Sequence, residues 1–174
     1  LNNPLDPDHP ELVLGKVAKA ARLNELEFYF PLADFNLSGL DELLADWFIS
    51  GWPQDKIRGF MKGYIDLVFC HDAKFYIVAW KSNFLGKDLN EYTPDKLRKV
   101  MGRDHYCLQY LIYTVALHRY LLTRLPGYSY EENFGGVFYI FLRGLGGKHL
   151  SDTGVFRDKP PLSLVLALSE LFGD

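Results

Sequence analysis

Asp66 and Lys81 are the two side chains whose spacing most strongly predicts chemistry. They lie in two β-prone runs separated by a short polar break. A two-residue turn at Asp72–Ala73 would pair these runs as antiparallel strands, with Asp66 opposite Ala79. Because side chains alternate along a strand, Ala79 and Lys81 then lie on one face. The pattern places a carboxylate and an ammonium group on either side of position 79.

An acidic residue at position 79 would complete a carboxylate pair with Asp66, because opposed Cβ atoms lie roughly 5 Å apart. Two carboxylates this close favour a hard divalent cation such as Mg²⁺. Lys81 would then stabilise negative charge on a phosphate, or position or deprotonate the attacking water. The alternatives are a structural salt bridge or helix cap for Asp66, and a strand-end lysine that reaches solvent for Lys81.

Gln109 and Tyr113 are four residues apart in a helical segment and therefore lie on one helix face. The pattern alone fits either a site on this face or an ordinary polar–aromatic pair.

Charge is distributed unevenly along the 174 residues, although the net charge is only −3. Residues 1–50 carry three basic and nine acidic side chains, whereas residues 51–103 carry ten basic and six acidic ones. The basic segment contains Asp66 and Lys81. Four of its cations are candidates for DNA phosphate contacts, with a solvated helix face as the alternative. These cations are Lys96, Arg98, Lys99 and Arg103.

The composition is that of one folded domain spanning residues 1–174, with 48% hydrophobic and 16% aromatic residues. Cys70 and Cys107 lack a metal or redox spacing, so we expect free thiols in a reducing cytoplasm. No apolar run reaches the roughly 18 residues of a membrane span. Because the chain begins at Leu1 rather than Met, we expect it to be a piece of a longer protein.

Periodicity and turn residues predict a mixture of helices and strands. We expect helices at 10–23, 39–50, 95–125 with a break near Gly102, and from Pro161 to Phe172. We expect strands around 26–30, ended by Pro31, and at 58–70, 74–82 and 135–142, with loops at 83–94 and 143–154. This mixture predicts an α/β fold with a mixed sheet and helices against both faces.

The amino-acid sequence around these residues resembles the RecB-type branch of the PD-(D/E)XK nuclease superfamily, over about residues 25–172. That superfamily has Asp on one strand and Asp/Glu-x-Lys on the next. The segments that carry the resemblance are GYIDLVF (63–69), WKSN (80–83), LQYLIYTVALHRYL (108–121), which includes the Gln-x-x-x-Tyr signature, and FGGVFYIFLRG (134–144).

The resemblance implies a restriction-endonuclease-like core and a C-terminal, Mg²⁺-dependent DNA nuclease domain of a helicase-nuclease that acts in break repair and recombination. It implies Asp66, position 79 and the Trp80 backbone carbonyl as metal ligands, Lys81 as catalytic, and Gln109 with Tyr113 near the DNA or metal. It also implies a bacterial cytoplasmic location, RecC-like and RecD-like partner subunits, and ATP use only in the parent helicase.

The sequence departs from the family in two places. Ala79 stands where the family has an acidic residue, so we expect this chain to be inactive. The family's metal-binding His, in a Gly-Thr-x-x-His pattern, has no counterpart here, and we do not assign its role to His9. The rival hypothesis is a non-catalytic, nuclease-like module that docks DNA or partner subunits.

Overall fold

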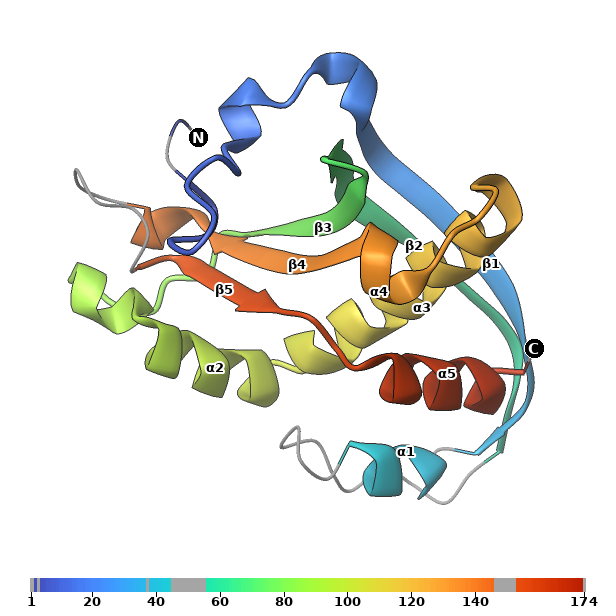
Figure 1. Cartoon of the computed structure of the whole chain (residues 1–174). Helices are drawn as coiled ribbons and strands as arrows, with labels where there is room; N and C mark the ends of the chain where they lie inside the picture. The colour runs from blue at the N-terminus through green and yellow to red at the C-terminus, as the bar shows by residue number, and fades with distance from the viewer. Residues whose placement is uncertain (1, 3, 37, 45–55, 146–152, 174) are drawn as a thin grey trace.

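A five-stranded mixed sheet forms the centre of the computed structural model, which describes residues 2, 4–36, 38–44, 56–145 and 153–173 (Figure 1). The strands follow one another in chain order across the sheet. All neighbours are antiparallel except β3 and β4, which are parallel. The strands are β1 (Arg22–Asn36), β2 (Lys56–His71), β3 (Lys74–Lys81), β4 (Phe134–Phe141) and β5 (Val155–Asp158).

The β2–β3 hairpin has the register expected from the sequence. Both residues of the Asp72–Ala73 turn have positive φ, which is the backbone conformation of a type I′ hairpin turn. The ladder runs as far as Leu67 paired with Val78. The predicted register is confirmed up to this pair, and Asp66 and Ala79 are the first residues beyond the end of the ladder.

The prediction that Pro31 ends the first strand is wrong. Pro31 pairs with Phe60, and β1 continues to Asn36 with a register shift between Leu32 and Phe35. The reason is that β1 is at the edge of the sheet, where a residue without an N–H group can be placed without removing a ladder hydrogen bond.

The N-terminal segment is not the helix predicted over residues 10–23. It forms two single 3₁₀ turns, η1 (Leu14–Lys16) and η2 (Lys19–Ala21), and then enters β1. The Arg22 guanidinium donates hydrogen bonds to the carbonyls of Leu14, at 2.6 Å, and Val17. In a continuous α-helix these carbonyls would accept backbone N–H groups instead. The arginine therefore stabilises the interrupted conformation.

The helical layer contains the crossover between the two parallel strands. The predicted 95–125 helix is present as α2 (Pro94–Arg103) and α3 (Tyr106–Arg124), interrupted at His105, which has a φ of 56°. The predicted C-terminal helix is α5 (Leu162–Leu171). The remaining helical segments are α1 (Ser38–Leu43), α4 (Tyr130–Asn133), η4 (Leu89–Tyr92) and η5 (Leu142–Gly144). The rest of the predicted 39–50 helix, from residue 45 onward, lies outside the described residues.

The sheet has a different cover on each face. The larger apolar core lies between one face and helices α2, α3 and α5, and includes Ile77, Ala79 and Tyr139. The N-terminal segment covers the other face with Leu5 and Leu12, among others. The α/β class with a mixed sheet and flanking helices is confirmed, whereas β5 has no counterpart among the predicted elements.

The described residues include no helix long and apolar enough to cross a membrane. The predicted free thiols are confirmed, since both cysteines are unpaired and Cys107 is buried.

Candidate active site

The candidate site lies where β2 and β3 separate. Past Leu67, β2 continues beside β1, whereas β3 continues beside β4 as far as Lys81. At this fork the Oδ2 atom of Asp66 accepts the backbone N–H of Trp80 at 2.9 Å. This hydrogen bond holds the carboxylate on β2 against the backbone of β3, at the residue directly before Lys81.

The Lys81 ammonium group is held from several sides. Its Nζ donates to Gln109 Oε1 at 2.7 Å. The same nitrogen lies 4.0 Å from the centroid of the Tyr106 ring and 4.9 Å from that of Tyr139, both within cation–π range. The side chain is half-buried, so this cation is partly shielded from water.

Gln109 connects the lysine to the rest of helix α3. Its Oε1 also accepts the Tyr139 hydroxyl at 3.1 Å, and its Nε2 donates to the Tyr113 hydroxyl at 3.1 Å. The structure therefore brings together Lys81, Gln109 and Tyr113, three residues that the sequence placed in one site.

The pKa of Lys81 is lowered by burial and raised, to a smaller extent, by the negative charge of Asp66. The pKa of Tyr113 is raised by burial and then by Asp66, while its hydrogen bond with Gln109 acts in the opposite direction. Burial is the main cause of both shifts, and the Asp66 charge is the second cause of each.

Position 79 supplies no metal donor. Ala79 is 1% exposed, belongs to the helix-side core and is aligned with Tyr139 of the neighbouring strand. Across the described parts of the chain, no group of three or more His, Cys, Asp or Glu side chains could hold a metal ion. Of the carboxylate pair that the family resemblance implies for Mg²⁺, only Asp66 is present. Trp80 contacts Asp66 through its backbone N–H, and its indole packs partly buried on the opposite face.

His9 lies in the N-terminal segment, where its Nδ1 is 3.2 Å from Glu11 Oε1. That segment covers the face of the sheet opposite α3, whereas Lys81 is bonded to α3. Leaving His9 out of the metal site agrees with this placement.

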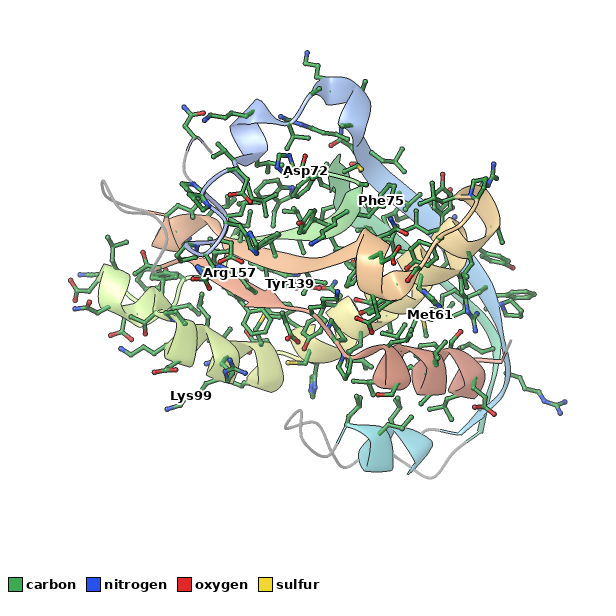
Figure 2. All side chains as sticks on the ribbon, viewed as in Figure 1. Met61, Asp72, Phe75, Lys99, Tyr139 and Arg157 are labelled. Atoms are coloured by element: carbon green, nitrogen blue, oxygen red, sulfur yellow. The ribbon has the colours of Figure 1, made fainter. Side chains whose placement is uncertain are left out.

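The four predicted DNA-contacting cations are all exposed on α2, but they do not act as one set. Arg98, Lys99 and Arg103 line a hollow of about 530 Å³, and Lys99 points away from the sheet (Figure 2). Lys96 is instead paired with Glu91 at 2.9 Å. Arg103 is also paired, with Asp104 at 2.7 Å, and the described lining of the hollow includes the carboxylate of Asp95.

A second, open groove of about 360 Å³ adjoins the site between α3 and the β1–β2 arm. Gln109 and Tyr113 form part of its wall, Phe28 and Met61 provide apolar surface, and Lys62 provides a cation. The groove is thus connected to Lys81 through Gln109.

The two aromatic rings that flank Lys81, those of Tyr106 and Tyr139, were not predicted from the sequence. Tyr106 precedes Gln109 by three residues, so helical spacing could have indicated that both lie on one face. Tyr139 gave no such signal, because its place depends on the parallel register of β3 and β4.

Comparison with known proteins gives consistent relatives. A search against family models found no match. The chain is 51% identical over 165 residues to "RecBCD enzyme subunit RecB" of Haemophilus influenzae, covering 92% of this chain and 14% of the relative. It is 41% identical over 165 residues to the protein of the same name from Escherichia coli, covering 91% and 14%.

A more distant relative of the same name, from Mycolicibacterium smegmatis, is 35% identical over 202 residues, covering 98% of this chain and 19% of the relative. The chain thus matches less than a fifth of the length of these relatives, but nearly all of its own residues take part. The chain belongs to the RecB family.

Proposed function

We propose that the chain is the C-terminal nuclease domain of a RecB-type subunit, and that the site it carries hydrolyses DNA phosphodiester bonds in break repair and recombination. One observation carries the proposal. In a chain related to RecB, the fork between β2 and β3 holds Asp66 at the backbone next to Lys81, and Lys81 donates to Gln109 of α3, which in turn donates to Tyr113. An acid, a partly desolvated cation and polar helix groups beside an open groove suit the binding of a phosphodiester.

Lys81 is the residue to which we assign transition-state stabilisation. Its ammonium group is half-buried, so its attraction for a phosphate oxygen is screened less than that of an exposed lysine. Gln109 fixes the ammonium position through a 2.7 Å hydrogen bond. Tyr113 and the adjoining groove would receive the nucleotide next to the scissile phosphate, and Arg98, Lys99 and Arg103 of α2 would contact the backbone further along.

The cofactor of this site is proposed to be Mg²⁺, held in the family by the carboxylates at positions 66 and 79 and by the carbonyl at position 80. In this chain Ala79 removes one of the two carboxylates. Since Mg²⁺ commonly binds one or two protein carboxylates together with water and phosphate oxygens, we expect this chain to bind the ion weakly and to lack nuclease activity.

The larger assembly is proposed from the name of the relatives, which are subunits of a RecBCD enzyme. RecC-like and RecD-like subunits would be the partners, in a bacterial cytoplasm. The 174 residues contain no Walker-type segment, so ATP would act in another part of the longer protein.

Restoring the missing carboxylate tests this function. In the full-length RecB-type subunit, which would supply the family's metal-binding His, Ala79→Asp should produce Mg²⁺-dependent cleavage of linear DNA that EDTA abolishes, whereas Ala79→Asn, which has the same shape without the charge, should produce none. In EDTA, Ala79→Asp should unfold at a lower temperature than the unmodified chain, because it buries a second carboxylate near Asp66. Mg²⁺ should raise its unfolding temperature again. Inactivity of Ala79→Asp together with an absence of metal stabilisation would contradict the proposal.

A docking module is the second candidate function, and it is favoured by the described residues, which form no group of three or more possible His, Cys, Asp or Glu ligands. In that case the chain would bind DNA or partner subunits without chemistry. Binding should then survive Asp66→Ala and Lys81→Ala, and the unmodified chain should give no response to Mg²⁺ or Mn²⁺ in calorimetry. Weak metal binding that is lost in Asp66→Ala would favour the degraded enzyme instead.

A further inference from the structure

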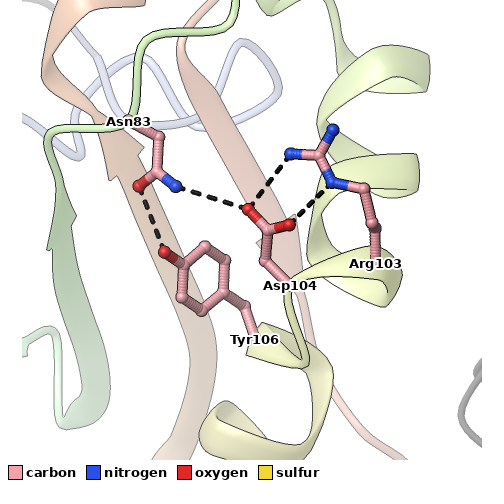
Figure 3. Close-up of polar contacts among 4 residues, drawn as sticks. All are labelled: Asn83, Arg103, Asp104 and Tyr106. Carbon is pink, nitrogen blue, oxygen red and sulfur yellow. Dashed lines mark hydrogen bonds and ion pairs between the residues drawn. The ribbon is translucent and has the colours of Figure 1, made fainter.

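A chain of polar contacts surrounds the ring that stacks on Lys81. The Tyr106 hydroxyl donates to Asn83 Oδ1 at 3.1 Å, and Asn83 Nδ2 donates to Asp104 Oδ2 at 3.3 Å (Figure 3). Asp104 is itself held by Arg103, with 2.7 Å between Nε and Oδ1. The ring is therefore connected to groups on both sides of the α2–α3 junction.

Tyr106 is fixed at both of its ends. Tyr106 is the first residue of α3 and directly follows His105, whose backbone is in the left-handed conformation. Its hydroxyl is bonded to Asn83, two residues after Lys81 on the same extended segment. A ring held at Cα and at its hydroxyl has little freedom to turn away from the ammonium group beside it.

The Lys81 side chain needs such support, because a lysine has four rotatable bonds and its ammonium is a point charge without a preferred geometry. Gln109 limits the ammonium from the helix side by a hydrogen bond, and the ring face of Tyr106 limits it at 4.0 Å. The pKa of Asp104 is lowered by its hydrogen bond with Arg103, so this carboxylate stays charged as an acceptor for Asn83.

We propose that Tyr106 is a positioning residue for Lys81, and that Asn83 and Asp104 hold its ring in place. The inference rests on the proposed nuclease function, in which Lys81 faces the phosphate. Tyr106 acts through the lysine and makes no contact with the reacting atoms. Arg103, which also lines the hollow on α2, connects the outer end of this network to the surface proposed to contact DNA.

The contact itself is tested without any nuclease activity. In the unmodified chain with ¹³C-labelled lysine, the ring current of Tyr106 should displace the ε-methylene resonance of Lys81, assigned by its loss in Lys81→Arg. Tyr106→Leu should return much of this displacement, and Tyr106→Phe should retain more of it. Tyr120→Leu is the matched control, since Tyr120 is an exposed tyrosine about four turns further along α3. An unchanged Lys81 resonance in Tyr106→Leu would overturn the inference.

The kinetic test uses the Ala79→Asp protein. Tyr106→Leu should lower kcat about tenfold with KM changed by less than about twofold, as expected when an interaction that orients a transition-state group is lost. Tyr106→Phe and Asn83→Ala should give smaller decreases, and Tyr120→Leu should give none. A normal kcat in Tyr106→Leu would contradict the positioning role. Should Ala79→Asp cleave no DNA at all, the proposed function falls, while the resonance measurement still decides the inference.

Discussion

Two aspartates near helix α3 have opposite surroundings. On β5, Asp158 Oδ2 accepts the hydroxyl of the buried Tyr110 at 2.7 Å, and its Oδ1 accepts the Lys159 backbone N–H at 2.9 Å. On β2, Asp66 accepts the Trp80 backbone N–H and acts electrostatically on Lys81. Both carboxylates accept neutral donors, but Asp158 is affected mainly by its burial, with a smaller effect of the Arg98 charge, whereas the charge of Asp66 opposes the effect of burial on Lys81.

The comparison separates a structural carboxylate from a chemical one. Burial raises the pKa of Asp158, which lines a separate hollow of about 220 Å³ together with Arg157 and Lys159. Asp66 lies at a fork in the sheet, beside a half-buried lysine and near a groove lined by Gln109 and Tyr113. A buried acid alone therefore predicts little. What matters is whether its neighbours are satisfied donors or groups still able to bind something.

The largest expected difference between the two regions is in catalysis. In the Ala79→Asp protein, Lys81→Met should lower the rate of DNA cleavage by about 10²–10³-fold, as is typical when a group that stabilises transition-state charge is removed. Tyr110→Phe, beside Asp158, should change the rate by less than about threefold at a temperature where the variant is folded. Single-turnover cleavage of a labelled linear DNA measures both. Equal losses in the two variants would remove the distinction.

Stability should show the reverse order. Tyr110→Phe leaves the part-buried Asp158 without its 2.7 Å donor, and we expect a loss of about 1–3 kcal/mol in the free energy of unfolding. Asp66→Asn keeps an oxygen that can accept the Trp80 N–H and should cost less than about 1 kcal/mol. Urea denaturation at neutral pH compares them. A larger loss for Asp66→Asn would mean that Asp66 is the structural residue.

Surface cations beside the two regions should differ in DNA binding. Lys99 lines the hollow on α2, so Lys99→Gln should weaken DNA binding by roughly threefold to tenfold and reduce the salt slope by about one. Lys159→Gln is the matched control, because Lys159 is an exposed lysine next to Asp158. Fluorescence anisotropy at several salt concentrations measures both, and equal effects would argue against a DNA surface on α2.

The smallest expected effect is on the pH dependence of stability, with opposite signs at the two regions. Lys81 has a pKa lowered from 10.5, so between its folded pKa and 10.5 only the unfolded chain holds the proton, and stability rises with pH. Asp158 has a pKa raised from 3.8, so between 3.8 and its folded pKa only the folded chain holds the proton, and stability falls with pH.

Variants at Lys81 and Asp158 separate these two contributions to the pH dependence of stability. Lys81→Met should remove the alkaline rise, and Asp158→Asn should remove the acidic fall, in urea denaturation across a pH series. In addition, Asp66→Asn should lower the pKa of Lys81 further, because it removes the charge that opposes burial. A rise in that pKa, followed by ¹³C resonances of the lysine, would contradict the coupling between Asp66 and Lys81.

Local rules of sequence determined the central part of the site. A two-residue turn fixes the register of a hairpin, and alternation then fixes which side chains share a face, so the pairing of β2 with β3 up to Leu67 and Val78 followed from spacing alone. The four-residue spacing of Gln109 and Tyr113 fixed a shared helix face in the same way, and the two are bonded.

Only the tertiary structure decided what surrounds these groups. The parallel register of β3 with β4 places Tyr139 near Lys81, and the break at His105 turns α3 so that Tyr106 lies over the same ammonium group. Similarly, the hydrogen bonds of the Arg22 guanidinium stabilise two short turns where the sequence predicted a helix. These features depend on contacts between residues far apart in sequence, or on one side chain that overrides local propensity. Such causes leave no periodic signal in the sequence.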